Sequence, residues 1–306
     1  MNKKNRKKII ALLSCIFLCL FLLGAASEDK SNNLSDTNSD EIHLILDIMR
    51  FDQLPTHFRT TADLSVFNNT NINTKGMSTL NISGSEQFSK TNLPMLVDAI
   101  KSPYKITDID LRQESHGFIN ELPISWANAL DNANAGLNLS QINMRENKLL
   151  KSVPLNKPLT FYNRPDVTIT PTVTYTEETL VKSNGLSYIR IPVTDFDLPD
   201  NSAVDYFLNL VKNQPKNSWL HFHCKEGVGR TTTFMIMYDI IKNCNYVSLD
   251  DIITRQVNFP VSFKEETKAK FSQGKEFVFL SKFYEYCKSN AKDNNPSWSN
   301  WIKLHI

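Results

Sequence analysis

Apolar residues along the chain fall into short continuous runs and longer helix-spaced stretches. The runs at 186–193 and 218–222 have the length of buried strands, and 105–109 reads as a third strand. Helical spacing or a long apolar run predicts helices over 141–151, 203–212, 232–241, 249–256 and 277–288. Strands that alternate with helices predict an α/β fold, with a central sheet flanked by helices.

One stretch, 153–175, has neither pattern. It carries four prolines around Val-Thr-Ile-Thr and Val-Thr-Tyr-Thr and alternates like short strands. We therefore expect a small β-rich module around 150–178, inside a domain that spans 42–306. Residues 27–41, rich in Ser, Asn and Asp, predict a flexible leader before that domain.

The N-terminus has the three parts of a secretory signal peptide. Basic residues at 3–8 precede an apolar run at 9–23, and Gly24-Ala25-Ala26 follows. We expect cleavage near Ala26 and a secreted or cell-envelope protein. The apolar run, about 15 residues, is short for a membrane span, and no second one follows, so no integral span is expected after cleavage. A lipoprotein anchored at Cys15 is less favoured, because little apolar sequence precedes that residue.

Charge and cysteine content narrow the class of partner. The full sequence has 34 Lys or Arg and 32 Asp or Glu. Removing 1–26 takes away five basic and no acidic residues, which leaves a formal charge of about −3. Nucleic acid is therefore not expected as a partner. Three cysteines remain, a poor disulfide framework; the sequence leaves open whether Cys244 and Cys287 pair.

The candidate chemistry lies between the 218–222 strand and the helix that follows. Cys224, five intervening residues and Arg230 place a nucleophile and a phosphate clamp around one loop at a helix N-terminus. A free thiol, with a pKa of about 8.5, needs such an electropositive setting to react as thiolate. Thr231 can donate its hydroxyl to the sulfur, and His223 is expected to hydrogen-bond loop carbonyls. The phosphate-binding loop itself comprises Lys225, Glu226, Gly227, Val228 and Gly229.

This spacing is the signature of cysteine-dependent phosphatases, which form a phosphocysteine intermediate. The alternative is a structural cysteine beside a helix start. No cluster of His, Cys and carboxylate residues has metal-ligand spacing in the sequence, and the cysteine mechanism needs no metal, so neither metal nor cofactor is expected.

A general acid should come from a loop that reaches the bound phosphate. Three carboxylates follow the 186–193 strand, namely Asp195, Asp197 and Asp200. Asp200 precedes a helix and has the position of an N-cap, and Asp197 can be a solvated loop charge. Asp195 lies at the strand end, where sites of α/β proteins gather, and is favoured.

Several ordered segments resemble the protein-tyrosine-phosphatase-like phytases, also called cysteine phytases. The matching segments are Phe58–Thr61, Asp110–Gly117, Ile191–Asp195, Trp219–Cys224, Arg230–Thr232 and Pro296–Trp301. The resemblance implies a phosphatase core with a small β domain and an inositol polyphosphate as substrate. It also implies Cys224 as nucleophile, Asp195 as general acid and Arg230 as clamp. Family members often carry His-Val-Trp-Pro after the acid, where this chain has Phe196-Asp197-Leu198-Pro199.

The basic residues that would bind further phosphates are less sharply defined. By resemblance Arg59 and downstream lysines such as Lys268 contact them, although locally Arg59 reads as a surface arginine. The lysines at 264, 268, 270 and 275 alternate with glutamates, as on a solvated face. Asp110 lies near the site by resemblance; an Asp–Arg pair that braces the loops is an equal alternative.

Two other functions compete with a phytase. A secreted protein-tyrosine or phosphoinositide phosphatase would use the same loop and signal peptide. A non-catalytic phosphate-binding module would keep the fold, but the intact Cys, Arg and Asp argue against it. The sequence leaves the oligomeric state open, a homodimer included.

Overall fold

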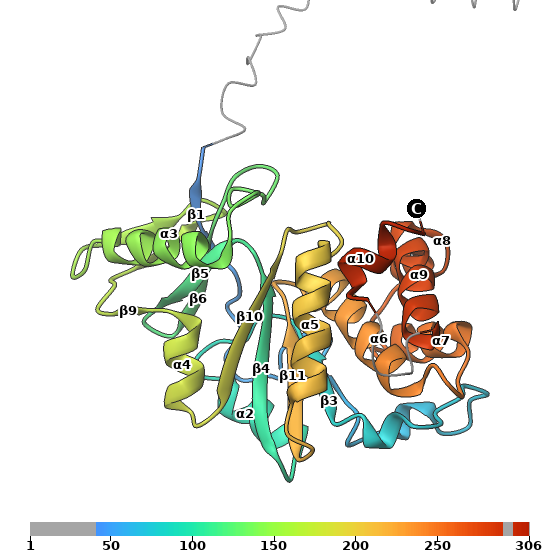
Figure 1. The fold of residues 1–306 in the computed structure, drawn as a ribbon. Helices are drawn as coiled ribbons and strands as arrows, with labels where there is room; N and C mark the ends of the chain where they lie inside the picture. Colours follow the sequence, from blue (N-terminus) through green and yellow to red (C-terminus); the bar gives the residue numbers. More distant parts are fainter. Residues whose placement is uncertain (1–40, 290–295, 306) are drawn as a thin grey trace, which may run out of the picture. The chain divides into compact units, whose positions relative to one another are not determined.

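A five-stranded sheet forms the centre of the computed structural model, which describes residues 41–289 and 296–305 (Figure 1). Its strands lie in the order β10 (Ser187–Val193), β4 (Lys105–Arg112), β11 (Ser218–His223), β3 (Ile82–Ser85), β2 (Arg59–Thr60). The first four are parallel and β2 is antiparallel to β3. Since parallel strands end at one edge of a sheet, β10 and β11 deliver Asp195 and Cys224 to the same edge.

The two faces of this sheet differ in chemistry, because successive side chains of a strand point to opposite faces. Ile109 and Leu111 of β4 and Phe222 of β11 lie in the main apolar core. On the other face His221 lies beside Asp108, and His223 beside Asp110, in the register of the two strands. That face is apolar at its start, where Trp219 pairs with Ile106, and polar toward the site.

Helices cover both faces of the sheet. The main core includes residues of six described α-helices: α5 (Asn201–Asn213), α6 (Gly229–Asn243), α7 (Leu249–Asn258), α8 (Glu265–Gln273), α9 (Lys275–Ser289) and α10 (Trp298–Ile302). A second core, around Phe88, Phe118 and Trp219, includes α2 (Leu93–Ile100) and α4 (Glu177–Ser183). α8 packs against α7 and α9. A buried ion pair between Arg255 and Asp239 joins α7 to α6.

A second sheet has four antiparallel strands, two of which directly follow β4 in the sequence. Its order is β1 (His43–Leu46), β6 (Leu122–Ala127), β5 (Ser115–Ile119), β9 (Thr174–Tyr175). A hairpin of β7 (Leu159–Phe161) and β8 (Arg164–Ile169) shares its apolar cluster with α3 (Leu139–Ser152). The range 150–178 thus supplies β7, β8 and β9, while most of the four-stranded sheet comes from earlier segments, whose apolar runs the sequence analysis did not single out.

The predicted helices are confirmed within about two residues at each end as α3, α5, α7 and α9, and the predicted buried helix as α6, which begins earlier, at Gly229. Asp200 caps α5, as expected, by accepting a hydrogen bond from the Ala203 amide at 2.7 Å. Trp298 of α10 donates from Nε1 to the Asn201 side chain at 2.8 Å. The C-terminal helix therefore holds the first turn of α5, directly after the loop that carries Asp195.

The mixed α/β architecture confirms the predicted fold class. The described residues, 41–289 and 296–305, belong to one compact unit. The signal peptide predicted at 1–26, and all but the last residue of the leader predicted at 27–41, lie outside the described residues. Among the described helices, none combines the length and apolarity required to cross a bilayer.

Candidate active site

Cys224 follows the last residue of β11 and lies in the loop that leads into α6. Its side chain is 3 % exposed, and the Thr231 hydroxyl donates to its Sγ at 3.2 Å. The N–H groups and dipole at the start of α6 favour negative charge in this position. The loop thus provides a setting for a thiolate and for a bound phosphate, and Thr231 has the contact expected of it.

The two loop glycines have different structural reasons. Gly227 has φ +70°, and a Cβ there would lie 2.3 Å from the Glu86 amide nitrogen. Only glycine fits this turn, because the backbone of Ser85 and Glu86 at the end of β3 passes directly behind it. A Cβ added at Gly229 would have no atom within 4 Å, so there is room for a side chain at this position, which lines the pocket.

Arg59 lies behind the loop rather than in front of it. Its Nη1 donates to the Gly227 carbonyl at 3.1 Å and its Nη2 to the Thr232 hydroxyl at 3.1 Å. Burial lowers its pKa to about 9, against the opposing effect of Cys224. The surface reading of Arg59 is wrong, since the residue is 3 % exposed, and its contacts support the loop backbone.

Arg230 is held by a carboxylate that the sequence analysis did not single out. Its Nη1 donates to Glu114 Oε2 at 2.7 Å and to the Val193 carbonyl at 3.0 Å, and Nη2 donates to Glu114 Oε1 at 3.1 Å. Burial would lower the pKa of Arg230, but Glu114 raises it above its ordinary value. Its Nε has no hydrogen-bond partner among the described residues, which leaves that N–H for a ligand.

Of the three candidate acids, Asp195 alone contacts the clamp. Its Oδ1 lies 3.1 Å from Arg230 Nη2, and its side chain is 21 % exposed. Asp197 is 66 % exposed and pairs with Lys275 at 3.2 Å. Phe196, between these two aspartates, has φ +59°. Its backbone carbonyl accepts a hydrogen bond from Lys275 Nζ at 2.6 Å. The loop therefore places Asp195 inward and Asp197 at its outer surface.

These residues line a pocket of about 500 Å³. The lining residues are Asp195, Phe196, Asp197, Cys224, Glu226, Val228, Gly229, Arg230, Thr233, Lys270, Phe271, Lys275 and Glu276. The predicted loop residues Glu226, Val228 and Gly229 are among them. Burial raises the pKa of Glu226. Among the residues that the structure describes, Lys270 of α8 and Lys275 of α9 are the lysines that line this pocket.

Two predicted phosphate contacts lie elsewhere. Lys268 pairs with Glu265, three positions earlier, at 2.8 Å and does not line the pocket. Lys225 turns toward Asp131 at 3.6 Å and Asp47 at 3.9 Å. Helical spacing explains the first: positions 268 and 270 are about 200° apart around α8, so one helix cannot direct both toward the same side.

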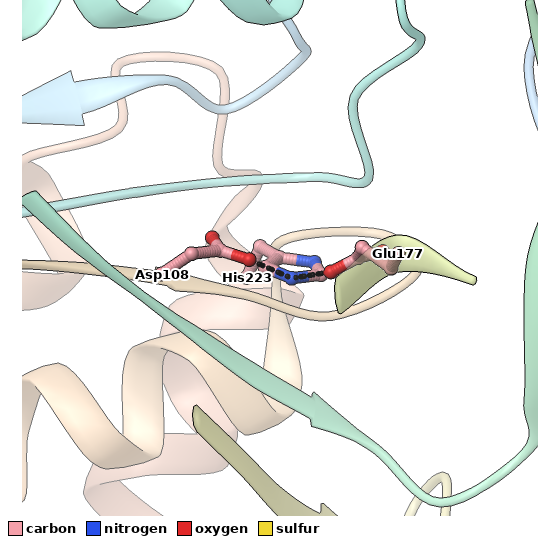
Figure 2. Close-up of side chains that lie close together, drawn as sticks. All are labelled: Asp108, Glu177 and His223. Carbon is pink, nitrogen blue, oxygen red and sulfur yellow. Dashed lines mark ion pairs between the residues drawn. The ribbon is translucent and has the colours of Figure 1, made fainter. Parts of the chain in front are cut away.

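His223 contacts carboxylates rather than loop carbonyls, which corrects the expectation from sequence. Its Nε2 lies 2.7 Å from Glu177 Oε1 and 3.4 Å from Asp108 Oδ2. Figure 2 shows the imidazole between the two acids, with both ion pairs drawn. Burial would lower the pKa of His223, but Glu177 and Asp108 raise it well above its ordinary value. The two acids therefore favour the protonated form of the residue before the nucleophile.

Asp110 is fully buried and acts as a brace. It lies 3.1 Å from Arg190 Nε and 3.3 Å from His116 Nε2, and it accepts hydrogen bonds from the Tyr188 hydroxyl and the Arg112 amide. It does not line the pocket around Cys224. The bracing alternative is thus the one that the geometry supports, with the substrate-contact alternative unsupported.

Two buried clusters have the composition of metal ligands. They are Asp108, Glu177 and His223, and Asp110, His116 and Glu177. In the first, His223 Nε2 and Glu177 Oε1 form an ion pair at 2.7 Å. Two atoms bound at about 2.1 Å to one tetrahedral ion would lie about 3.4 Å apart. In the second, Arg190 already supplies a cation to Asp110. Neither cluster fits a metal ion.

The supporting residues of β4 share one signal in the sequence. In β4, Asp108, Asp110 and Arg112 alternate with Ile109 and Leu111. Polar side chains at every second position of a strand in a parallel sheet are unusual, because both faces of such a sheet are usually apolar. This alternation marks a polar face. Glu114 and Glu177 carry no comparable local signal, since their partners come from distant segments.

Comparison with known proteins places this geometry in a family. A family model for PTP-like phytases, described as "Inositol hexakisphosphate", matches residues 109–242. A PTP-like phytase structure from Bdellovibrio bacteriovorus is 30% identical, has a TM-score of 0.68, and the match covers 86% of this chain and 95% of that one.

Two longer proteins are also similar. A PTP-like myo-inositol phosphatase structure from Mitsuokella multacida, solved with myo-inositol-(1,3,4,5)-tetrakisphosphate, is 33% identical with a TM-score of 0.74, over 86% of this chain and 48% of that one. Effector protein hopD2 of Pseudomonas syringae pv. tomato is 29% identical over 83% of this chain and 59% of its own length. The chain thus spans only about half to three fifths of these relatives.

The Bdellovibrio structure is the informative one for identity, because the match runs over nearly its whole chain. The family model covers the strand-loop-helix unit that carries Cys224 and Arg230. The chain belongs to the protein-tyrosine-phosphatase-like phytases, a family of cysteine-dependent phosphatase hydrolases.

Proposed function

We propose that this protein removes phosphate from myo-inositol hexakisphosphate through a phosphocysteine intermediate. One observation carries the proposal: Cys224, Arg230 and Asp195 line a single pocket together with Lys270 and Lys275. A compact polyanion requires cations beyond the one that holds the reacting phosphate. The solved relative with a bound inositol tetrakisphosphate supports the same substrate class.

In the first step, the Cys224 thiolate attacks phosphorus. The sulfur–phosphorus bond forms while the bond from phosphorus to the inositol oxygen breaks, and Asp195 in its acid form gives its proton to that oxygen. Arg230 holds two equatorial oxygens through Nε and Nη2 as the phosphoryl group becomes planar. The amides of the loop and of the first turn of α6 stabilise the same charge.

In the second step, water attacks the phosphocysteine. Asp195, now a carboxylate, takes a proton from that water while the oxygen–phosphorus bond forms and the sulfur–phosphorus bond breaks. Inorganic phosphate leaves, the thiolate returns, and Asp195 is again an acid. The roles of Cys224, Asp195 and Arg230 belong to this proposal, as do the loop residues Glu226 to Gly229.

The signal peptide at 1–26 supports export, and we include a secreted or cell-envelope location in the proposal. Sequencing the N-terminus of protein recovered outside the cytoplasm tests it, with Ser27 expected as the first residue after cleavage at Ala26. An intact Met1 on the exported protein would contradict the cleavage.

The activity is tested by phosphate release from inositol hexakisphosphate, with Cys224→Ser as the inactive control. A panel with phosphotyrosine peptides and phosphoinositides separates the alternative, because one relative bears the name of an effector protein. We expect the highest kcat/KM on inositol hexakisphosphate. A higher value on phosphotyrosine peptides would replace the proposed substrate, and release that persists in Cys224→Ser would remove the mechanism.

A further inference from the structure

Six buried side chains connect the two ends of the active-site loop through a chain of ion pairs and hydrogen bonds. In order they are His223, Glu177, Gln87, Arg112, Glu114 and Arg230, and we call them the buried chain. Each of the five contacts is 2.7 or 2.8 Å long. Its first member precedes Cys224, and its last is the phosphate clamp.

Glu177 is the hub of this chain. Its Oε1 contacts His223, and its Oε2 accepts a hydrogen bond from Gln87 Nε2 at 2.7 Å. His116 Nε2 lies 3.4 Å from the same Oε2. As the first residue of α4, after the Thr176 cap, Glu177 carries its charge at the helix end that favours an anion. It brings a helix from outside the sheet into contact with the residue next to the nucleophile.

Gln87 extends the connection to the loop backbone. Its backbone N–H donates a hydrogen bond to the Lys225 carbonyl at 3.1 Å, and its side-chain Oε1 accepts one from Arg112 Nη1 at 2.7 Å. A shift of Glu177 would therefore reach the loop by two routes, through His223 and through Gln87. Both routes end within one residue of Cys224.

The groups that face His223 show why Glu177 is the deciding one. Asp108 of β4 is the second acid, but burial raises its pKa to about 7, opposed by His223 itself. His221, on the same face of β11, is neutral, because burial holds its pKa far below the ordinary value. The Phe88 ring, with its centre 5.2 Å from that of His223, is apolar. Of the two acids in contact with His223, Glu177 has, despite its burial, a pKa lowered by that imidazole and by His116. Asp110, opposite His223 in the strand register, is paired instead with Arg190 and His116.

We propose that Glu177 is a positioning residue for the reaction: it keeps His223 a cation behind Cys224 and ties it to the Arg230 clamp. His223 is the chain neighbour of Cys224, and a cation close to a thiol favours the thiolate. This inference rests on the phosphocysteine chemistry proposed above, although not on the identity of the phosphate ester. Its test therefore uses a reaction of Cys224 that needs no substrate.

The test compares Glu177→Gln with Glu178→Gln in the full chain. Glu178 is the next residue of α4, half-exposed, and pairs with Lys182 on the surface. Iodoacetate inactivation is followed from pH 4.5 to 8, with modification of Cys224 quantified by peptide mass spectrometry, because Cys244 and Cys287 are also free. At pH 5 to 6 we expect Glu177→Gln to react roughly tenfold or more slowly than wild type. Glu178→Gln should stay within about twofold.

A double-mutant cycle separates positioning from a general structural role. In a His223→Asn background, Glu177→Gln should cause little further loss, since its effect passes through His223. Additive losses would overturn the proposal, as would equal reactivity of Glu177→Gln and wild type. If inositol hexakisphosphate is not hydrolysed while the alkylation results hold, the substrate proposal fails and this one stands.

A measurement on the unaltered protein covers the case in which Glu177→Gln does not fold. Nitrogen-15 shifts of the imidazole groups report whether both nitrogens of His223 carry protons. We expect an imidazolium at pH 7 and a neutral ring for His221. A neutral His223 at pH 7 would overturn the proposal without any variant.

Discussion

The Arg230 guanidinium and the Glu114 carboxylate meet through two parallel hydrogen bonds, at 2.7 and 3.1 Å. The same carboxylate accepts a third bond, from Arg112 Nε at 2.8 Å. All three residues are buried. Paired hydrogen bonds fix the plane of the guanidinium, so Glu114 holds Arg230 in one orientation at the pocket.

We therefore expect Glu114→Ala to be among the most destabilising substitutions in this protein. It leaves Arg112 with fewer partners and removes the carboxylate partner of buried Arg230, and loss of one member of a buried ion pair costs about 3–5 kcal/mol. Urea unfolding measures the loss. The surface substitution Glu178→Ala should stay within about 0.5 kcal/mol. A loss below about 1 kcal/mol for Glu114→Ala would show that the clamp does not depend on this carboxylate.

Asp195→Asn should lower kcat for inositol hexakisphosphate by roughly 10²–10⁴-fold, the range for loss of a general acid. The loss should shrink for an aryl phosphate, whose leaving group needs less protonation. Asp197→Asn is the matched control, because that carboxylate is mostly exposed and pairs with Lys275. The assignment is reversed if Asp197→Asn shows the large loss and Asp195→Asn does not.

The two loop glycines provide a second matched pair. Gly227→Ala places a methyl group 2.3 Å from a backbone nitrogen and requires φ +70°, so we expect a loss of about 2 kcal/mol or more. Gly229→Ala meets no atom within 4 Å and should stay within about 0.5 kcal/mol. Thermal unfolding of both variants decides it. Equal losses would mean that the loop relaxes around position 227.

Lys270 and Lys275 should distinguish a polyphosphate from a single phosphate ester. Replacing both by Met is expected to raise KM for inositol hexakisphosphate about tenfold or more, equivalent to about 1.4 kcal/mol, with little change for an aryl phosphate. Lys268→Met serves as control, since Lys268 pairs with Glu265 away from the pocket. An equal rise in KM for Lys268→Met would contradict the assignment of further phosphate contacts to Lys270 and Lys275.

Stability should fall as pH rises from about 6.5 to 9. Burial would lower the pKa of His116, but Asp110 raises it to about 9. A histidine whose folded pKa lies above its unfolded value stabilises the fold below the unfolded pKa, and this contribution disappears as pH passes the folded pKa. The slope for one such group is about 1 kcal/mol per pH unit. Urea unfolding at pH 6.5, 7.5 and 8.5 should show a shallower slope for His116→Gln than for wild type; equal slopes would exclude this residue as the origin.

The local parts of the site were predictable from sequence, and the long-range parts were not. Cys224, Arg230 and Thr231 belong to one strand-loop-helix unit, where chain neighbours fix the geometry. The contact of His223 with Glu177 joins segments 46 positions apart, and nothing near either residue indicates it. The orientation of Arg59 toward Gly227 likewise depends on how β2 pairs with β3. Helix phase, rather than composition, decided which lysines reach the pocket.

The buried chain also bears on how this protein can be divided and how it folds. The matched family region, 109–242, contains Cys224, Asp195 and Arg230. Arg59 and Gln87 lie before this region, and Lys270 and Lys275 lie after it. Arg59 supports Gly227 from 168 positions away. Contacts this distant in sequence form slowly, because the entropy of closing a long loop is lost before the contact stabilises the chain. A segment cut to the matched region would contain the reactive groups but lack the residues that orient them. During refolding, activity should therefore return only when the whole fold has formed, and not with the first native helices.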